Sequence, residues 1–132
     1  MQRLEFEAAW DKTIAKRDRE KIIDIFQGLT HKDKGIVFTF LKQAINHRND
    51  LLLMVLIHNY NAERAVFKSP KIRVKKQENI IAEYQFERQP PDLKGNTSIP
   101  WTFIFPQGSY VKQVDYSDAE LILITKESPL SS

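Results

Sequence analysis

The sequence predicts a mainly β protein in which about seven short strands form an antiparallel, two-sheet β-sandwich of immunoglobulin-like shape, preceded by one N-terminal α-helix. Two observations carry this prediction. Beyond Gly35 the apolar residues recur at every second position, which is the period of a half-buried strand. Turn-forming clusters such as PPDLKGN and PQGS separate the strand-like runs, with no helical pattern between them. A small closed barrel is the second architecture that this pattern allows.

Residues 1–30 are expected to form an extended lead-in followed by the helix. The lead-in alternates apolar and acidic residues in LEFE, and its apolar side chains are expected to pack under the domain. From Lys16 to Gln27, in KRDREKIIDIFQ, apolar residues including Ile22 and Phe26 share one helical face, and charged residues occupy the other. Gly28 follows directly and is expected to close the helix.

The sandwich is expected over residues 36–125. The run LLLMVLIH, residues 51–58, is apolar on both faces, which predicts a central strand covered on each side. The expected strands are 36–41, which the pattern allows to continue to Ile45, and then 51–58, 65–67, 71–76, 80–86, 100–105 and 120–125.

The stretch SIPWTFIFP places Trp101, Phe103 and Phe105 on one strand face between two prolines. These rings either form part of the core or provide an exposed platform for a ligand or a partner. Together they could bury roughly 450 to 750 Å², a gross gain of about 11 to 19 kcal/mol. Exposed, they would equal or exceed the largest apolar patch usual on a soluble monomer, roughly 300 to 600 Å². Burial is therefore favoured, with Pro100 at the start of the strand or on an edge and Pro106 at its end.

Length and composition indicate one soluble globular domain. The chain has 132 residues, of which 42% are hydrophobic and 28% charged, a mixture that supports a core without a disulfide or metal. We expect a single domain over residues 1–127 and a flexible tail at 128–132. The chain contains no cysteine, which excludes disulfides and thiolate zinc sites. No signal peptide or run long enough to span a bilayer is recognised, so a cytoplasmic location is expected.

The charges are uneven although the net charge is only +3. The segment RAVFKSPKIRVKK contains six basic residues and no acidic one, whereas residues 113–127 are mainly acidic. The basic residues could bind nucleic acid or another polyanion. They could instead form a solvated face whose lysines discourage edge-to-edge aggregation, and this is the favoured interpretation because the neighbouring face is aliphatic. The candidate anion-binding residues are Arg64, Lys68, Lys71, Arg73, Lys75 and Lys76.

No catalytic or cofactor motif stands out. The three histidines, His31, His47 and His58, have no metal-ligand spacing, and we expect His58 to finish a strand and His47 to lie in a turn. Four glycines leave little for a phosphate-binding loop. We therefore expect no metal, no cofactor and no enzymatic activity; an enzyme whose site is assembled from scattered carboxylates and histidines is the remote alternative.

Three segments, LEFEAAWDKTIAKRDREKI, AINHRNDLLLMVLIHNYN and PWTFIFP, resemble the SLAP-domain proteins of Gram-positive, spore-forming bacteria. In some members this domain is linked to an accessory Sec secretion system that serves S-layer assembly, and the larger members carry it in a longer context, whereas this chain resembles a single copy. The resemblance implies a non-enzymatic accessory domain. The matching residues are Trp10 to Ile14, Asp18-Arg19, Ile45-Asn46-His47, His58-Asn59 and Pro100 to Phe103.

A protein partner is the leading expectation, because a strong predicted core is combined with an absence of active-site chemistry. The partner is expected to add a strand at a sheet edge or to bind a polar corner at Trp10, Asp11 and Lys12.

Overall fold

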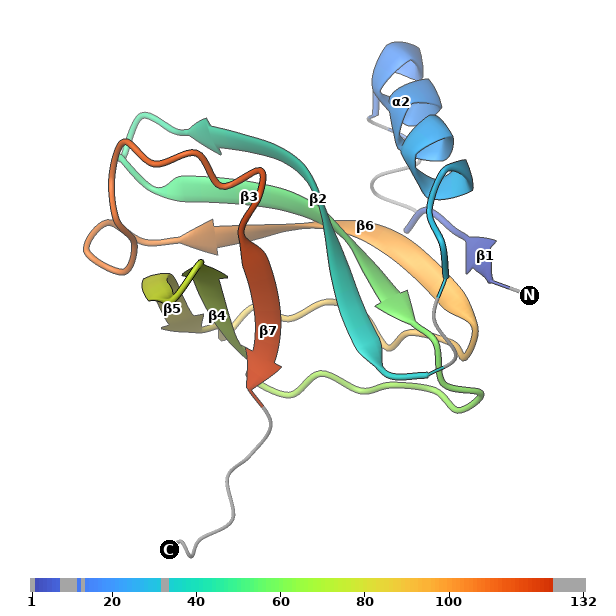
Figure 1. Ribbon diagram of the computed structural model, residues 1–132. Coiled ribbons are helices and arrows are strands. Elements are labelled where there is room, and N and C mark those ends of the chain that lie inside the picture. Colours follow the sequence, from blue (N-terminus) through green and yellow to red (C-terminus); the bar gives the residue numbers. More distant parts are fainter. Residues whose placement is uncertain (1, 8–11, 13, 32–33, 125–132) are drawn as a thin grey trace, which may run out of the picture.

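The structure, a computed structural model, describes residues 2–7, 12, 14–31 and 34–124 (Figure 1). Its strands form two sheets that pack face to face (Figure 1). One sheet has four strands in the order β1-β6-β3-β2, and the other has three in the order β5-β4-β7. The elements are β1 (Arg3–Leu4), α2 (Lys16–Gln27), β2 (Ile36–Ile45), β3 (Leu51–Asn59), β4 (Lys71–Lys76), β5 (Asn79–Gln85), β6 (Thr97–Phe105) and β7 (Glu120–Ile124). The predicted sandwich with a preceding helix is thereby confirmed.

Two local predictions need correction. The expected strand 65–67 is only a single bridge between Ala65 and Leu93, with hydrogen bonds of 2.8 and 2.9 Å, because the run is too short to pair further. The strand expected at 100–105 begins at Thr97, so Pro100 lies within β6 and not at its start.

The lead-in contributes a strand that the sequence did not reveal. β1 pairs with the beginning of β6, and this pairing is parallel, unlike the other strand pairs of the two sheets. It covers only Thr97 and Ser98, so Pro100 faces no neighbouring strand on that side. The alternative that placed this proline on an edge is therefore correct.

The core lies between the sheets and contains the rings of SIPWTFIFP. Trp101 is 7% exposed, Phe103 2% and Phe105 0%, which confirms that this strand face is buried. The rings meet alternate residues of β3, including Leu53 and Val55, and the fully buried inner residues of β4.

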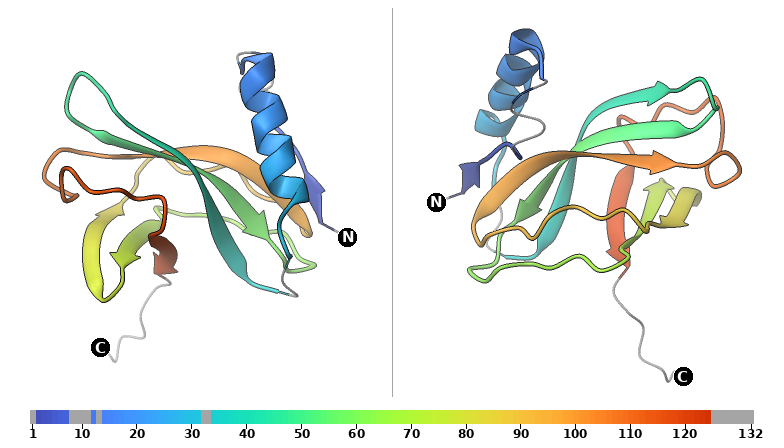
Figure 2. Two further views of the ribbon diagram at one scale, coloured as in Figure 1. Left: turned by 45° about the horizontal axis from the view of Figure 1, so that its top comes forward. Right: turned by 180° about the vertical axis from the view of Figure 1, so that it is seen from behind.

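Helix α2 lies at one end of the four-stranded sheet, on its outer side and next to β1 (Figure 2). Ile22 is its one buried residue, and Gly28 closes the helix by donating to the carbonyls of Asp24 and Ile25, both at 3.1 Å. Because the helix covers one end of the outer face, Leu56 of β3 is fully buried there. No helix in the described part of the chain has the length and apolar character needed to cross a membrane.

Candidate functional site

The predicted polar corner at Trp10, Asp11 and Lys12 is only partly visible. Trp10 and Asp11 lie outside the described residues, and Lys12 is exposed. A role for this corner stays a prediction.

The basic stretch lies largely on β4, the central strand of the three-stranded sheet. Ile72 and Val74 are fully buried, and the basic side chains at 71, 73 and 75 occupy the opposite face, as the two-fold period predicts. Glu83 of the neighbouring β5 accepts from Arg73 Nε at 2.6 Å and contacts Lys71 Nζ at 3.2 Å. The hydrogen bond from Arg73 lowers the pKa of Glu83 below its ordinary value.

Two further cations of this stretch also have acidic neighbours. Lys76 Nζ lies 3.3 Å from a carboxylate oxygen of Asp118, and Arg64 lies 3.9 Å from Asp92. These carboxylates weaken the attraction of the stretch for a polyanion. Because β4 has strands on both sides, the interpretation that its lysines protect an edge is wrong.

A second cluster of polar groups is buried beneath helix α2. His58 is fully buried on the outer face of β3, and its ring nitrogens contact two hydroxyls: Ser98 Oγ at 2.5 Å and Thr39 Oγ1 at 2.8 Å. The three residues come from β3, β6 and β2, so the ring joins three neighbouring strands. Burial, and to a smaller extent nearby His31, lowers the pKa of His58 from 6.5 to about 4.

Aromatic rings surround this histidine. Tyr60 stacks on His58 at 5.1 Å between ring centroids, and its hydroxyl lies 3.0 Å from His31 Nδ1. Phe26 of helix α2 packs 4.8 Å from His31 and 6.5 Å from His58. The helix thus packs an aromatic ring against His31 and His58. The third histidine, His47, lies in the turn after β2, as expected.

The chemistry open to this cluster is limited by access. A histidine beside a serine hydroxyl is the pairing that activates a nucleophile. Here His58 and Ser98 are both 0% exposed, so no substrate atom reaches the hydroxyl. Among the described residues no group of three or more metal-ligating side chains could hold an ion.

The residues after His58 organise the adjoining loops. The Asn59 side-chain amide donates to the carbonyls of Glu63, Leu93 and Lys94 at 2.8 to 3.2 Å. Asn61 accepts at its side chain from Gly35 N at 3.0 Å. The motif HNYN, residues 58–61, therefore connects two loops to the end of β3 through hydrogen bonds. The residue types alone did not indicate this role.

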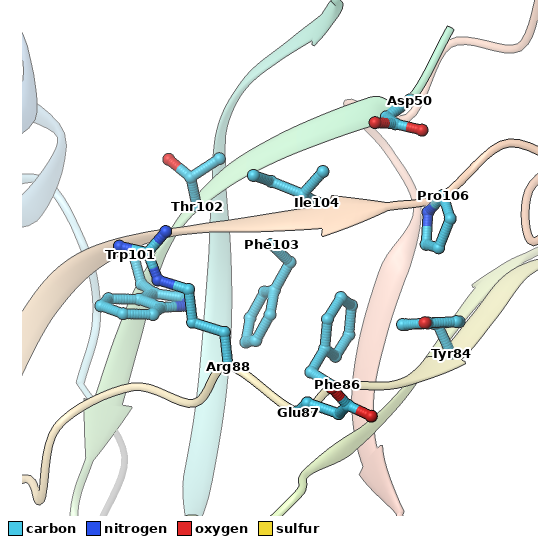
Figure 3. A pocket seen from close by; sticks show the side chains of 10 residues that line it. All are labelled: Asp50, Tyr84, Phe86, Glu87, Arg88, Trp101, Thr102, Phe103, Ile104 and Pro106. Atoms are coloured by element: carbon cyan, nitrogen blue, oxygen red, sulfur yellow. The ribbon is translucent and has the colours of Figure 1, made fainter. Parts of the chain in front are cut away.

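A groove opens between β6 and the end of β5 (Figure 3). It has a volume of about 280 Å³ and a largely aromatic lining that includes Tyr84, Phe86, Trp101 and Phe103. Charged groups stand at its rim, and Figure 3 shows Arg88 beside Trp101 and Asp50 near Pro106. The sequence pattern predicted burial for Trp101 and Phe103 and did not predict a hollow beside them.

The groove runs along a free sheet edge. The carbonyls of Asn96 and Ser98 accept from β1, so the backbone groups of even-numbered residues in β6 point to that side. Beyond Ser98 no strand within the described residues covers them. The outer edge of β5, by contrast, is capped, since Glu83 N donates to Ser109 O at 3.0 Å and Val111 N to Ile81 O at 2.7 Å.

Fold and site together define a mainly β sandwich with one covered face, a buried histidine cluster and an open strand edge above an aromatic groove. The family model of the SLAP domain matches residues 4–124, nearly the whole chain. The chain therefore belongs to the SLAP-domain family, as its resemblance implied. Neither the curated proteins nor the solved structures give a match.

Proposed function

We propose that this SLAP domain is a non-enzymatic protein-interaction module that receives an extended segment of its partner on the free edge of β6. The observation that carries the proposal is this edge, which presents backbone groups that no strand among the described residues pairs, beside an aromatic groove. Such an edge is a template for a further strand, whose main chain provides affinity and whose alternate side chains provide specificity. Membership of the family favours an accessory role in secretion or S-layer assembly.

The buried polar groups support a binding role over a catalytic one. The pairing of a histidine with a serine hydroxyl, His58 with Ser98, is closed from solvent. The groove contains no histidine, and one of its acids is engaged, because Asp50 accepts from Gln107 N at 3.1 Å.

Site-specific photo-crosslinking in the native host tests the proposal. A photoreactive residue replaces Ile104, which is 41% exposed beside the free edge, or Val66, which is 51% exposed elsewhere. We expect a discrete protein adduct at position 104 and none at 66. The Thr102→Pro variant removes an edge N–H that makes no bond to β3, so the adduct should disappear while the fold persists. Equal adducts at both positions, or no adduct, would overturn the proposal.

A further inference from the structure

We propose that the segment bound by β6 is short, runs antiparallel to β6, and has an apolar residue between a basic N-terminal end and an acidic C-terminal end. This inference rests on the proposed function and specifies its ligand. The length, the apolar centre and the charged ends follow from separate features of the groove.

The two prolines limit the length. Pro100 and Pro106 both fall at positions whose backbone points to the free side, and neither has an N–H. The N–H groups of Thr102 and Ile104 are therefore the donors that β6 offers there, and no hydrogen bond within the described residues uses them. A segment of about five residues uses both donors, and a longer partner strand would meet proline at each end.

The groove accounts for the apolar centre. A strand added to β6 points alternate side chains into the layer that contains Trp101 and Phe103. There they meet Phe86, whose ring lies 5.1 Å from Phe103, and Tyr84, whose ring is 5.1 Å from Phe86. At about 280 Å³ the groove is smaller than most small-molecule sites, which span roughly 300 to 1,000 Å³. Its size therefore suits one or two side chains of an extended segment.

Charges of opposite sign mark the two ends. The guanidinium of Arg88 lies 5.9 Å from the centre of the Trp101 ring, whereas Asp50 is held beside Pro106 by its bond from Gln107 N. Glu87 adds a second negative charge on the wall opposite β6 (Figure 3). An antiparallel segment, the more stable pairing, begins near Asp50 and ends near Arg88. Complementarity then places its basic residue first and its acidic residue last.

Other occupants fit less well. The hollow between β2 and β7, about 540 Å³, is lined by residues 36–38 and 119–123, of which only Glu120 is charged, so it has no opposed ends. A second copy of the chain could pair its β6 with this edge, but its inward rings already lie in its own core. The aromatic groove would then stay unfilled.

Two peptides of identical composition test the direction, and a third tests the apolar centre. The probes are acetylated, amidated Lys-Thr-Leu-Thr-Glu, its reversal Glu-Thr-Leu-Thr-Lys, and Lys-Thr-Ser-Thr-Glu with a polar centre. Binding to the full chain is followed by amide NMR shifts at low salt. We expect the first peptide to shift the Thr102 and Ile104 amides saturably, the second to bind about threefold more weakly, and the third not to bind detectably.

Charge reversal on the protein supplies the matched control. Arg88→Glu should weaken Lys-Thr-Leu-Thr-Glu about threefold and strengthen Lys-Thr-Leu-Thr-Lys, whereas Arg64→Glu, away from the groove, should change neither. Equal affinity for the forward and reversed peptides refutes the assigned direction. Any of three other outcomes would overturn the inference. In the first the peptides cause no saturable amide shift, and in the second they cause shifts only at residues 36–38 and 119–123. In the third the chain instead forms a dimer that Thr102→Pro abolishes. A partner adduct at position 104 would still leave the proposed function standing.

Discussion

Acidification should destabilise this protein through His58 well above the pH at which carboxylates titrate. In the unfolded chain this histidine takes a proton near pH 6.5, whereas in the folded protein its pKa is about 4. Between these values the unfolded state binds more protons, so the free energy of unfolding falls as the pH falls. At roughly 1.4 kcal/mol per pKa unit, the difference between the two pKa values corresponds to about 3 kcal/mol in the free energy of unfolding. About 2 kcal/mol of this stabilisation is lost between pH 8 and pH 5.

The structure explains why the proton is unfavourable. The His58 ring is fully buried, and both its partners are neutral hydroxyls, so none of the contacts that the described residues make to it brings a carboxylate to compensate a positive charge. His31, 6.0 Å away between ring centroids, adds no compensating negative charge. Glu83 and Asp115 also have lowered pKa values, but their stabilisation is lost only below their unfolded values of 4.5 and 3.8. Measurements above pH 5 therefore isolate the histidine.

Urea unfolding of the wild type, His58→Gln and His47→Gln at pH 8, 7, 6 and 5 measures the effect. We expect the wild type and the His47→Gln control to lose about 2 kcal/mol over this range. His58→Gln should be less stable at pH 8, because one hydroxyl contact is lost, but nearly independent of pH. If His58→Gln keeps the wild-type slope, or if NMR places the folded pKa of His58 near 6.5, the reasoning is refuted.

Three further substitutions test other parts of the structure. Gly95→Ala should lower the free energy of unfolding in urea by about 2 kcal/mol or more, because an added Cβ would lie 2.0 Å from the carbonyl oxygen of Ala62. Gly28→Ala is the control and should be nearly neutral, because its Cβ would meet only ordinary contacts. Asn59→Ala removes the side-chain donor to three main-chain carbonyls, of which Leu93 O keeps a second bond, from Ala65 N, and should cost about 2 to 3 kcal/mol by the same assay; an unchanged midpoint would show that these bonds add nothing. Glu83→Gln removes the negative charge beside Arg73 and Lys71 and should change stability by less than about 1 kcal/mol while strengthening retention on heparin at low salt; unchanged retention would argue against the predicted anion-binding stretch.

Features that depend on local periodicity were predictable from the sequence. The strand at 71–76 and the helix at 16–27 have the expected bounds, and the strand that begins at Ile36 continues to Ile45, as its pattern allowed. The alternation of Trp101 and Phe103 with polar or smaller residues was enough to assign their burial. In each case the residue types favour the same structure that packing requires, so local pattern and tertiary fold agree.

Features that depend on which segments become neighbours were not predictable. A two-residue parallel strand at Arg3–Leu4 leaves no periodic signal, and its pairing decides where the edge of β6 becomes free. The approach of His31 to His58 crosses the whole of β2, and no spacing along the chain indicates it. The groove likewise arises because β6 and β5 belong to different sheets, a relation that spacing along the chain does not encode.

The two halves of β6 serve different purposes, and this separates stability from binding. Hydrogen bonds hold the first half in place. Ser98 contacts His58, and Gln2 donates to Ser98 Oγ at 3.0 Å and to Asn59 O at 3.2 Å. The second half, beyond Pro100, has a free edge. Because a residue without an N–H separates them, substitutions in the histidine cluster should lower the free energy of unfolding without changing peptide affinity. Thr102→Pro should do the reverse, and a variant that altered both together would show that cluster and edge are coupled.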